Sequence, residues 1–456
     1  MNIESINPAN GESVATYKAM TSKEVKHIID ESDLDWKNWR KTSFDERSQL
    51  MHMAAEVLRE NKASYAELMT LEMGKVLKDG ESEIEKCAWV CDYYADNAKE
   101  FLKDHKVDTE ASNSFISYKP IGIVLAVMPW NFPFWQVMRF AAPALMAGNA
   151  GVLKHASNVS GCAIAIEKAF QKAGFPKNIF RTLIIPSNQV AEVIKNEKVK
   201  AVTLTGSTPA GKSVAAIAGS QIKKTVLELG GSDPYIILQD ADLELAAKTC
   251  ATSRLINNGQ SCISAKRFIV VKEVKAEFEK LLSKYMSERV VGDPLDKRTD
   301  LGPMARMDLR DELHDQVTKS KEMGANCILG GAIDHNSEGA FYPPTILTDV
   351  KWGSPAYHEE LFGPVASIIE ASNEKEAIEI ANDSFFGLGA AVFTKDLKRG
   401  EHIAKDEIEA GCCFVNDFVK SDPRLPFGGV KGSGYGRELS AYGIKEFVNI
   451  KTVYIK

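Results

Sequence analysis

Hydrophobic residues recur at helical spacing after a short polar start, and this pattern covers the first hundred residues. The clearest run, with members three or four positions apart on one helix face, is Leu50, Met53, Ala54, Val57 and Leu58. A further long helix is expected over residues 81–102. Capping boxes, in which a hydroxyl and a Glu three positions later close a helix start, are expected at Thr21 with Glu24, Ser43 with Glu46 and Ser64 with Glu67.

From residue 115 the pattern changes to short β-branched runs separated by helical segments. Strands are expected at 121–128, 150–154, 181–185, 201–205, 225–229 and 235–238, and helices at 160–173 and 209–218. A second series follows, with strands at 268–271, 327–329, 365–369, 390–393 and 412–415 and helices at 275–286, 306–323 and 374–382. Apolar strands joined through helices are typical of parallel sheets covered on both faces, so we predict an α/β fold with two such units.

The tail, residues 446–455, alternates apolar and polar positions and predicts an exposed strand. An open strand edge tends to pair with another strand, and the tail therefore favours a homo-oligomer, either a dimer or a tetramer.

Length and composition narrow the class of protein. At about 100–200 residues per domain, 456 residues predict two or three domains. The net charge of −6, with both signs interspersed, argues against a nucleic-acid or membrane partner. No apolar run approaches the roughly 20 residues that span a bilayer, and no signal peptide is visible. The 8 cysteines form no disulfide framework and no zinc spacing, which predicts a cytoplasmic protein without a metal.

One segment matches a phosphate-binding loop. Residues 206–213 read GSTPAGKS after an expected strand and before an expected helix, so a P-loop nucleotidase is one interpretation. Pro209 suits the first turn of a helix, however, and would leave Lys212 about one turn inside that helix, aimed away from the loop. A more general interpretation is that Gly206 and Ser207 present free N–H groups at a helix N-terminus to the phosphates of a dinucleotide. A plain strand–helix turn is the third.

Three further segments carry chemistry. Cys262 follows a polar turn that contains Gly259, where backbone N–H groups can stabilise a thiolate; a lone Cys is more often a packing residue. Glu228 ends an apolar strand and can serve as a general base for water, or lie on the surface. Asn131, between two prolines, offers a fixed amide to an oxyanion, or a local turn bond.

These segments together resemble the aldehyde dehydrogenase superfamily, in order and over nearly the whole chain. The motifs are PWNFP at 129–133, LTGS at 204–207, ELGG at 228–231, NNGQSC at 257–262, EELFGPV at 359–365 and PFGGVKGSG at 426–434. The resemblance implies that Cys262 attacks the aldehyde, that Asn131 stabilises the oxyanion and that Glu228 activates water. It also implies a dinucleotide site, formed by Trp130, Lys154, Ser157, Gly206, Ser207, Glu360 and Phe362.

The resemblance also bears on which dinucleotide binds. Many NAD-preferring relatives carry a Glu three residues after the Lys, where this chain has Ser157. A carboxylate there would repel a 2′-phosphate, and Lys154 could help to neutralise that phosphate. NAD and NADP are therefore both expected to be accepted, with the preference open.

Within the superfamily, the segments WQVMR at 135–139, KHA at 154–156 and GYGRELS at 434–440 most resemble those of bacterial NAD(P)-accepting succinate-semialdehyde dehydrogenases. Arg139 lies eight residues past Asn131, two helical turns on, and a guanidinium suits a substrate carboxylate. The alternative is an interdomain salt bridge. Further carboxylate contacts are expected from Ser421, Arg254 or Arg424. Other ω-carboxy aldehydes such as glutarate semialdehyde, and a broad aldehyde range, remain alternatives. So do a CoA-dependent relative and a catalytically silent scaffold.

The resemblance implies three parts: a Rossmann-like cofactor domain, an α/β catalytic domain and a small oligomerisation sheet. The expected boundaries are 1–106 with 124–231, then 232–439, then 107–123 with 440–456.

Overall fold

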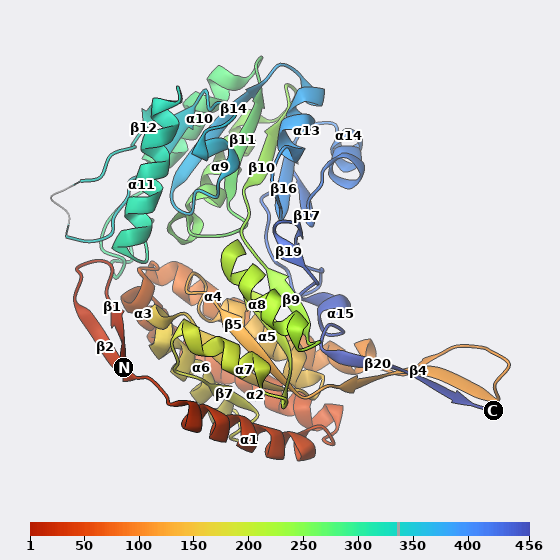
Figure 1. Cartoon of the computed structure of the whole chain (residues 1–456). Helices are drawn as coiled ribbons and strands as arrows, with labels where there is room; N and C mark the ends of the chain where they lie inside the picture. The colour runs from red at the N-terminus through yellow and green to blue at the C-terminus, as the bar shows by residue number, and fades with distance from the viewer. Residues whose placement is uncertain (335–337) are drawn as a thin grey trace.

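The computed structural model describes residues 1–334 and 338–456. Figure 1 shows two α/β bodies, one above the other, and a narrow arm that projects from the lower body. Each body is built on its own sheet, and the arm carries the C-terminus.

The lower body contains the first predicted series of strands. Its sheet has the order β19-β9-β8-β5-β6-β7. The strands are β5 (Ile123–Met128), β6 (Ala150–His155), β7 (Phe180–Thr182), β8 (Val199–Thr205), β9 (Lys224–Glu228) and β19 (Gly434–Tyr435). All neighbours are parallel except β19, which pairs antiparallel with β9. Nearly every residue of β5 and β6 is buried, as expected for a sheet covered on both faces.

Helices of the lower body begin with the four predicted in the N-terminal region. They are α1 (Ser22–Trp39), α2 (Phe44–Glu60), α3 (Lys62–Met73), α4 (Leu77–Phe101), α5 (Trp135–Met146), α6 (Ser160–Lys172), α7 (Val190–Lys195) and α8 (Thr208–Ser220). Short 3-10 turns η1 (Ser157–Val159) and η2 (Ser187–Gln189) precede α6 and α7, and β1 (Asn2–Ile6) pairs with β2 (Ser13–Lys18). Capping boxes at Thr21 and Ser43 are confirmed. The one predicted at Ser64 is wrong, because α3 starts at Lys62 and the Ser64 hydroxyl donates to the Asn61 carbonyl.

The upper body contains the second series. Its sheet has the order β12-β13-β14-β11-β10-β16-β17, parallel except for β12. The strands are β10 (Asp233–Ile237), β11 (Ala265–Val271), β12 (Asn326–Leu329), β13 (Thr345–Thr348), β14 (Val365–Ala371), β16 (Gly389–Phe393) and β17 (Cys412–Val415). The helices are α9 (Leu243–Leu255), α10 (Lys275–Ser287), α11 (Met307–Glu322), α12 (Pro355–His358), α13 (Glu374–Asn382) and α14 (Leu397–His402), with the short turns η3 (Ile256–Gly259) and η4 (Ile403–Glu407). Two further short strands, β15 (Phe386–Gly387) and β18 (Val430–Lys431), form a separate antiparallel pair.

The arm is a three-stranded antiparallel sheet in the order β20-β4-β3. It consists of β3 (His105–Lys106), β4 (Asn113–Pro120) and β20 (Val448–Ile455), and α15 (Ser440–Gly443) leads into β20. The predicted tail strand thus pairs with β4 of its own chain, and its other edge stays open. Two strands cross the expected domain limits, since β19 joins the lower sheet and β3 joins the arm. The domain boundaries themselves stay a prediction.

The strand ends explain where the site lies. In the lower sheet β5, β6, β8 and β9 are parallel, so their carboxyl ends meet at one edge. The segments PWNFP, Lys154, Gly206-Ser207 and Glu228 all lie at those ends. Ligands of open α/β sheets bind at this edge, and the upper body faces it here.

Candidate active site

The loop that carries Cys262 is built from three left-handed residues in a row. Asn257, Asn258 and Gly259 have φ of 54, 56 and 74°, a region that Asn and Gly enter at lowest cost. The Asn257 amide donates to the Asn131 carbonyl at 2.8 Å, and the Asn258 amide donates to the carbonyls of Gly74 and Pro303 at 2.9 Å. The NNGQ segment therefore ties the nucleophile loop to both bodies.

Lys266 binds the backbone of the same loop. Its ammonium donates to the carbonyls of Ser261 at 2.9 Å and Cys262 at 2.8 Å. Burial raises the pKa of the Cys262 thiol to about 12, while the charges of Lys266 and Arg139 act to lower it. Burial therefore favours the protonated thiol, and the two cations reduce the cost of forming the reactive thiolate.

Asn131 lies beside the nucleophile loop, as an oxyanion donor requires. Its side-chain amide donates to the Gln260 carbonyl at 3.1 Å, two residues before Cys262. An amide nitrogen has two hydrogens, so one remains for an oxygen bound at Cys262. The side chain is almost fully buried, and the bond to Gln260 fixes its direction, while Asn257 holds the backbone carbonyl of Asn131.

Glu228 lies close to the site but behind its walls. Neither carboxylate oxygen has a hydrogen-bond partner among the described residues, and Glu438 is its main charged neighbour. Burial first, and the charge of Glu438 second, raise the pKa of Glu228 well above its usual range. The carboxyl is turned toward Gly428, where a Cβ would come within 2.7 Å of its oxygen. To act on a substrate it must rotate toward Cys262.

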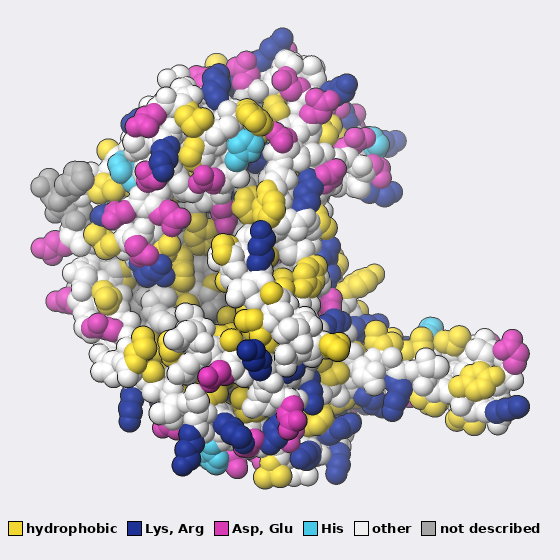
Figure 2. Space-filling model, in the orientation of Figure 1, with side chains coloured by type: hydrophobic (Ala, Val, Ile, Leu, Met, Phe, Trp, Pro, Cys, Tyr) yellow, Lys and Arg dark blue, Asp and Glu magenta, His cyan; other side chains and the backbone are white. Residues whose placement is uncertain are grey.

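Cys262 lies where two cavities meet. The larger, about 500 Å³, runs between the bodies, and the smaller, about 170 Å³, leads away on the other side of the thiol. Figure 2 shows the hollow between the two bodies on the face in view. Predicted cofactor residues on the larger cavity are Trp130, Gly206, Ser207, Glu360 and Phe362. A nucleotide would thus approach Cys262 from one side and a small substrate from the other.

The larger cavity has the features of a dinucleotide site. Ser207 is the N-cap of α8 and its hydroxyl makes no capping bond, so the first N–H groups of the helix are left for phosphate oxygens. Lys212 is one turn inside α8, with its ammonium 5.9 Å from the centre of the Phe385 ring, which does not fit a P-loop lysine. Phe362 packs edge-on against Trp130, with ring centres 5.7 Å apart, and forms a wall near Cys262.

Glu360 is positioned by the glycines of ELGG. It accepts from the Gly231 backbone N–H at 3.0 Å and lies 3.6 Å from the Lys266 ammonium. A Cβ on Gly230 would come within 2.4 Å of the Glu360 carboxylate, so a larger residue there would displace the carboxylate from this position. Ribose hydroxyls are suitable partners for this carboxylate.

Lys154 and Ser157 lie further from Cys262, beyond the cavity walls, at the end of β6 and the start of η1. The Lys154 side chain is buried and makes no hydrogen bond or ion pair within residues 1–334 and 338–456; burial lowers its pKa. A buried ammonium without a partner is costly, and an anionic group of a ligand would satisfy it. This observation fits a nucleotide phosphate.

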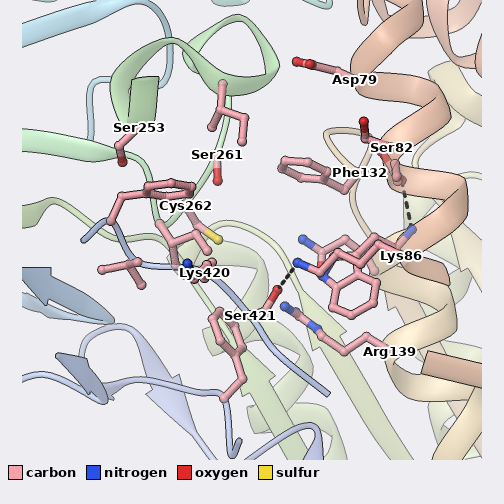
Figure 3. Close-up of a pocket in the computed structure, with 18 residues that line it drawn as sticks. Asp79, Ser82, Lys86, Phe132, Arg139, Ser253, Ser261, Cys262, Lys420 and Ser421 are labelled. Atoms are coloured by element: carbon pink, nitrogen blue, oxygen red, sulfur yellow. Dashed lines mark hydrogen bonds between the residues drawn. The ribbon is translucent and has the colours of Figure 1, made fainter. Parts of the chain in front are cut away.

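The smaller cavity contains only part of the predicted carboxylate site. Arg139 and Ser421 are on its wall, together with Lys86, which the sequence reasoning missed. Figure 3 shows Lys86 and Arg139 reaching toward Cys262 from the opposite side of this cavity, with Ser421 between Cys262 and the Lys86 ammonium. Arg139 already forms a buried ion pair with Glu438, the salt-bridge alternative, although it also faces the cavity.

The other two predicted anchors are not brought to the cavity. Arg254 is fully buried behind the nucleophile loop and donates to the carbonyls of Ala265 and Gly259. Arg424 is exposed, pairs with Asp422 at 2.6 Å and stacks over Trp89. Both predictions are corrected here: Arg254 satisfies backbone carbonyls, and Arg424 stays at the surface. The hydrogen bond from Lys86 to Ser421 joins positions 335 residues apart, a pairing that only the fold reveals.

No group of three His, Cys, Asp or Glu side chains that could hold a metal ion occurs among the described residues. No helix in this part of the chain is both long and apolar enough to cross a membrane.

With its nucleophile, amide donor, buried carboxylate and dinucleotide cleft in order, the chain belongs to the aldehyde dehydrogenase family, whose sequence profile matches residues 1–453. It is 51% identical over 456 residues, the full length of both chains, to a probable succinate-semialdehyde dehydrogenase [NADP(+)] of Synechocystis sp.. It is 49% identical over 459 residues to succinate-semialdehyde dehydrogenase [NADP(+)] 1 of Mycobacterium tuberculosis, again over the full length of both. The solved succinic semialdehyde dehydrogenase of Streptococcus pyogenes, in complex with NADP+, superposes with a TM-score of 0.97 at 41% identity and 99% coverage of each chain.

Proposed function

We propose that this enzyme oxidises succinate semialdehyde to succinate with a nicotinamide dinucleotide, NADP+ in preference to NAD+. The observation that carries the substrate is the basic wall of the small cavity opposite Cys262, where Arg139, Lys86 and Ser421 lie together. Cations there suit the carboxylate of a short aldehyde acid. The names of the Synechocystis and Mycobacterium relatives agree with this substrate.

The chemistry begins at Cys262. Its thiolate forms a C–S bond to the aldehyde carbon, and the resulting oxyanion accepts from the Asn131 amide and the Cys262 backbone N–H. A bound dinucleotide supplies the acceptor for the hydride that leaves this carbon, and a thioester to Cys262 results. Glu228, rotated toward the thioester, takes a proton from water; the hydroxide adds to the carbon and the C–S bond breaks. In total, the aldehyde, water and the oxidised dinucleotide give the carboxylate, the reduced dinucleotide and two protons.

Lys154 and Ser157 support the NADP preference. The buried Lys154 ammonium has no partner among the described residues, and no carboxylate stands at Ser157 to repel a 2′-phosphate. NAD+ lacks that phosphate but keeps the ribose and pyrophosphate contacts, so we propose that it is accepted more weakly. All 8 cysteines are unpaired, which fits a reducing compartment such as the cytoplasm.

The test compares succinate semialdehyde with butanal, which has the same chain length and no carboxylate, using NADP+ and NAD+ in turn. We expect kcat/KM to be at least tenfold higher for the acid aldehyde, and Cys262→Ala to abolish the oxidation of both. Equal kcat/KM values would contradict the substrate and indicate a broad-range enzyme. Nucleotide binding without any turnover would indicate a silent scaffold, and turnover only with added CoA would indicate acyl transfer.

A further inference from the structure

Three cations border the small cavity, and they differ in what they already bind. Arg139 is paired with Glu438 in a buried contact. Lys420, half exposed, is paired with Asp417 at 2.6 Å. Lys86 has no carboxylate within ion-pair distance in the described parts of the chain.

The Lys86 ammonium is nevertheless fixed in direction. It donates to the Ser421 hydroxyl at 2.9 Å and lies 4.3 Å from the centre of the Trp135 ring. Figure 3 shows it reaching from its helix toward Ser421 and the Cys262 side of the cavity. An ammonium has three hydrogens, so two remain after the bond to Ser421.

The acidic groups around Lys86 are engaged elsewhere. Glu83, one turn earlier on α4, is paired with Lys75 and accepts from the backbone N–H groups of Phe134 and Trp135 at 2.8 and 2.9 Å. Asp422, next to Ser421, is paired with Arg424 at 2.6 Å. Neither can turn to Lys86 without losing its own partners. A partly buried cation that binds only a hydroxyl is an incomplete site for an anion.

We propose that Lys86, with Ser421, is the principal anchor for the substrate carboxylate, and that Arg139 acts mainly by holding Glu438. This assignment rests on the proposed function, because it presumes an acid aldehyde in the small cavity. It differs from the expectation drawn from the sequence, in which Arg139 had that role. Arg139 binds Glu438, the main charged neighbour of the buried Glu228, so its removal would disturb the catalytic carboxylate as well as the cavity.

The assignment has a consequence for the pH dependence. Burial, and then the charge of Arg139, lower the pKa of Lys86 to about 8, while Cys87, Glu83 and Asp422 act in the opposite direction. The ammonium is therefore present below pH 8 and is lost as the pH rises through that value. The substrate carboxylate stays ionised over this range. Selectivity for the acid over the uncharged aldehyde should fall above pH 8, whereas thiolate formation at Cys262 affects both substrates alike.

The experiment measures the ratio of kcat/KM for succinate semialdehyde to that for butanal, from pH 6.5 to 9.5. We expect Lys86→Met to lower this ratio roughly 10- to 100-fold at pH 7, mainly through KM of the acid, and to remove its decline above pH 8. Lys86→Gln keeps a donor to Ser421 without the charge and carries the same expectation, which covers a folding defect in Lys86→Met. Lys99→Met, an exposed lysine of the same helix paired with Asp45, is the matched control and should leave ratio and profile unchanged.

The outcomes separate this inference from the proposed function. If the wild type prefers the acid aldehyde and both Lys86 variants keep its ratio and pH profile, the role of Lys86 is overturned while the substrate stands. If the wild type shows no preference, the substrate and the anchor both fail.

Discussion

At the scale of single residues, the basic side chains near Cys262 differ in what they already bind: Arg139 binds Glu438, Arg254 binds backbone carbonyls, and Lys86 binds only a hydroxyl. Cys262 and Asn131 could be proposed from local motifs rich in Gly, Asn and Pro, whereas Glu360 was implied only by the family resemblance. The carboxylate anchors could not be predicted in that way, because an arginine near the nucleophile in sequence, such as Arg254, can be consumed by buried carbonyls. Lys86 reaches the cavity only because α4 packs against α5 and the loop of Ser421.

Ser157 offers a test of the dinucleotide preference at one position. Ser157→Glu would place a carboxylate near the buried Lys154, where it repels a 2′-phosphate and can instead bind a ribose diol. We expect kcat/KM with NADP+ to fall at least tenfold, a change worth about 1.4 kcal/mol, and kcat/KM with NAD+ to stay or rise. Ser157→Ala, which adds no charge, should keep the NADP+ preference. A Glu variant with an unchanged NADP+/NAD+ ratio would show that this position does not face the phosphate.

At the scale of elements, most helices and strands follow from hydrophobic spacing, and the exceptions have identifiable causes, one local and one that depends on the folded chain. The third predicted capping box is absent because α3 begins at Lys62, with Asn61 as its N-cap. Ser64 therefore lies inside the first turn of the helix, and its hydroxyl donates to the Asn61 carbonyl. The pairing of β19 with β9 could not be foreseen, since Gly434 and Tyr435 carry no strand pattern and find their partner only in the folded chain.

The nucleophile loop makes a prediction at this scale. Gly259 has φ of 74°, and a Cβ there would lie 2.3 Å from the Gly363 carbonyl carbon. Gly259→Ala must therefore displace the loop, because the atoms that the new Cβ would meet are backbone atoms of Gly363 and Pro364 and not a flexible side chain. We expect kcat/KM to fall at least 100-fold and alkylation of Cys262 by iodoacetamide to change in rate. Gly219→Ala is the matched control: its Cβ meets nothing within 4 Å, and it should gain about 0.5–1 kcal/mol of stability in α8. Wild-type activity in Gly259→Ala would show that the loop tolerates displacement.

At the scale of the whole molecule, the arm is the part that packs least against the rest of the chain. It extends away from both bodies, as Figure 1 shows, and β20 leaves one edge unpaired. Ile450 and Tyr454 on β20 are 60% and 55% exposed. The sequence predicted an exposed tail strand, but its partner β4 and the projection of both strands from the body depend on the fold. An open edge with exposed apolar side chains suits pairing with a second copy of this chain.

We therefore predict that the assembly of this chain into a homo-oligomer depends on β20. We expect the wild type to sediment as a dimer or tetramer, and Ile450→Lys to shift it toward smaller species at micromolar concentration, because the charge must be desolvated in the interface. Ile328→Lys is the matched control, since Ile328 is an exposed isoleucine on β12, an edge strand of the upper body. Sedimentation velocity across a concentration series distinguishes the three proteins. A wild type that remains monomeric, or an Ile450→Lys variant that assembles as the wild type does, would contradict an interface on the arm. Since the cavities and Cys262 lie between the two bodies and away from the arm, a dissociated variant that still oxidises the aldehyde would further show that one chain holds the complete site.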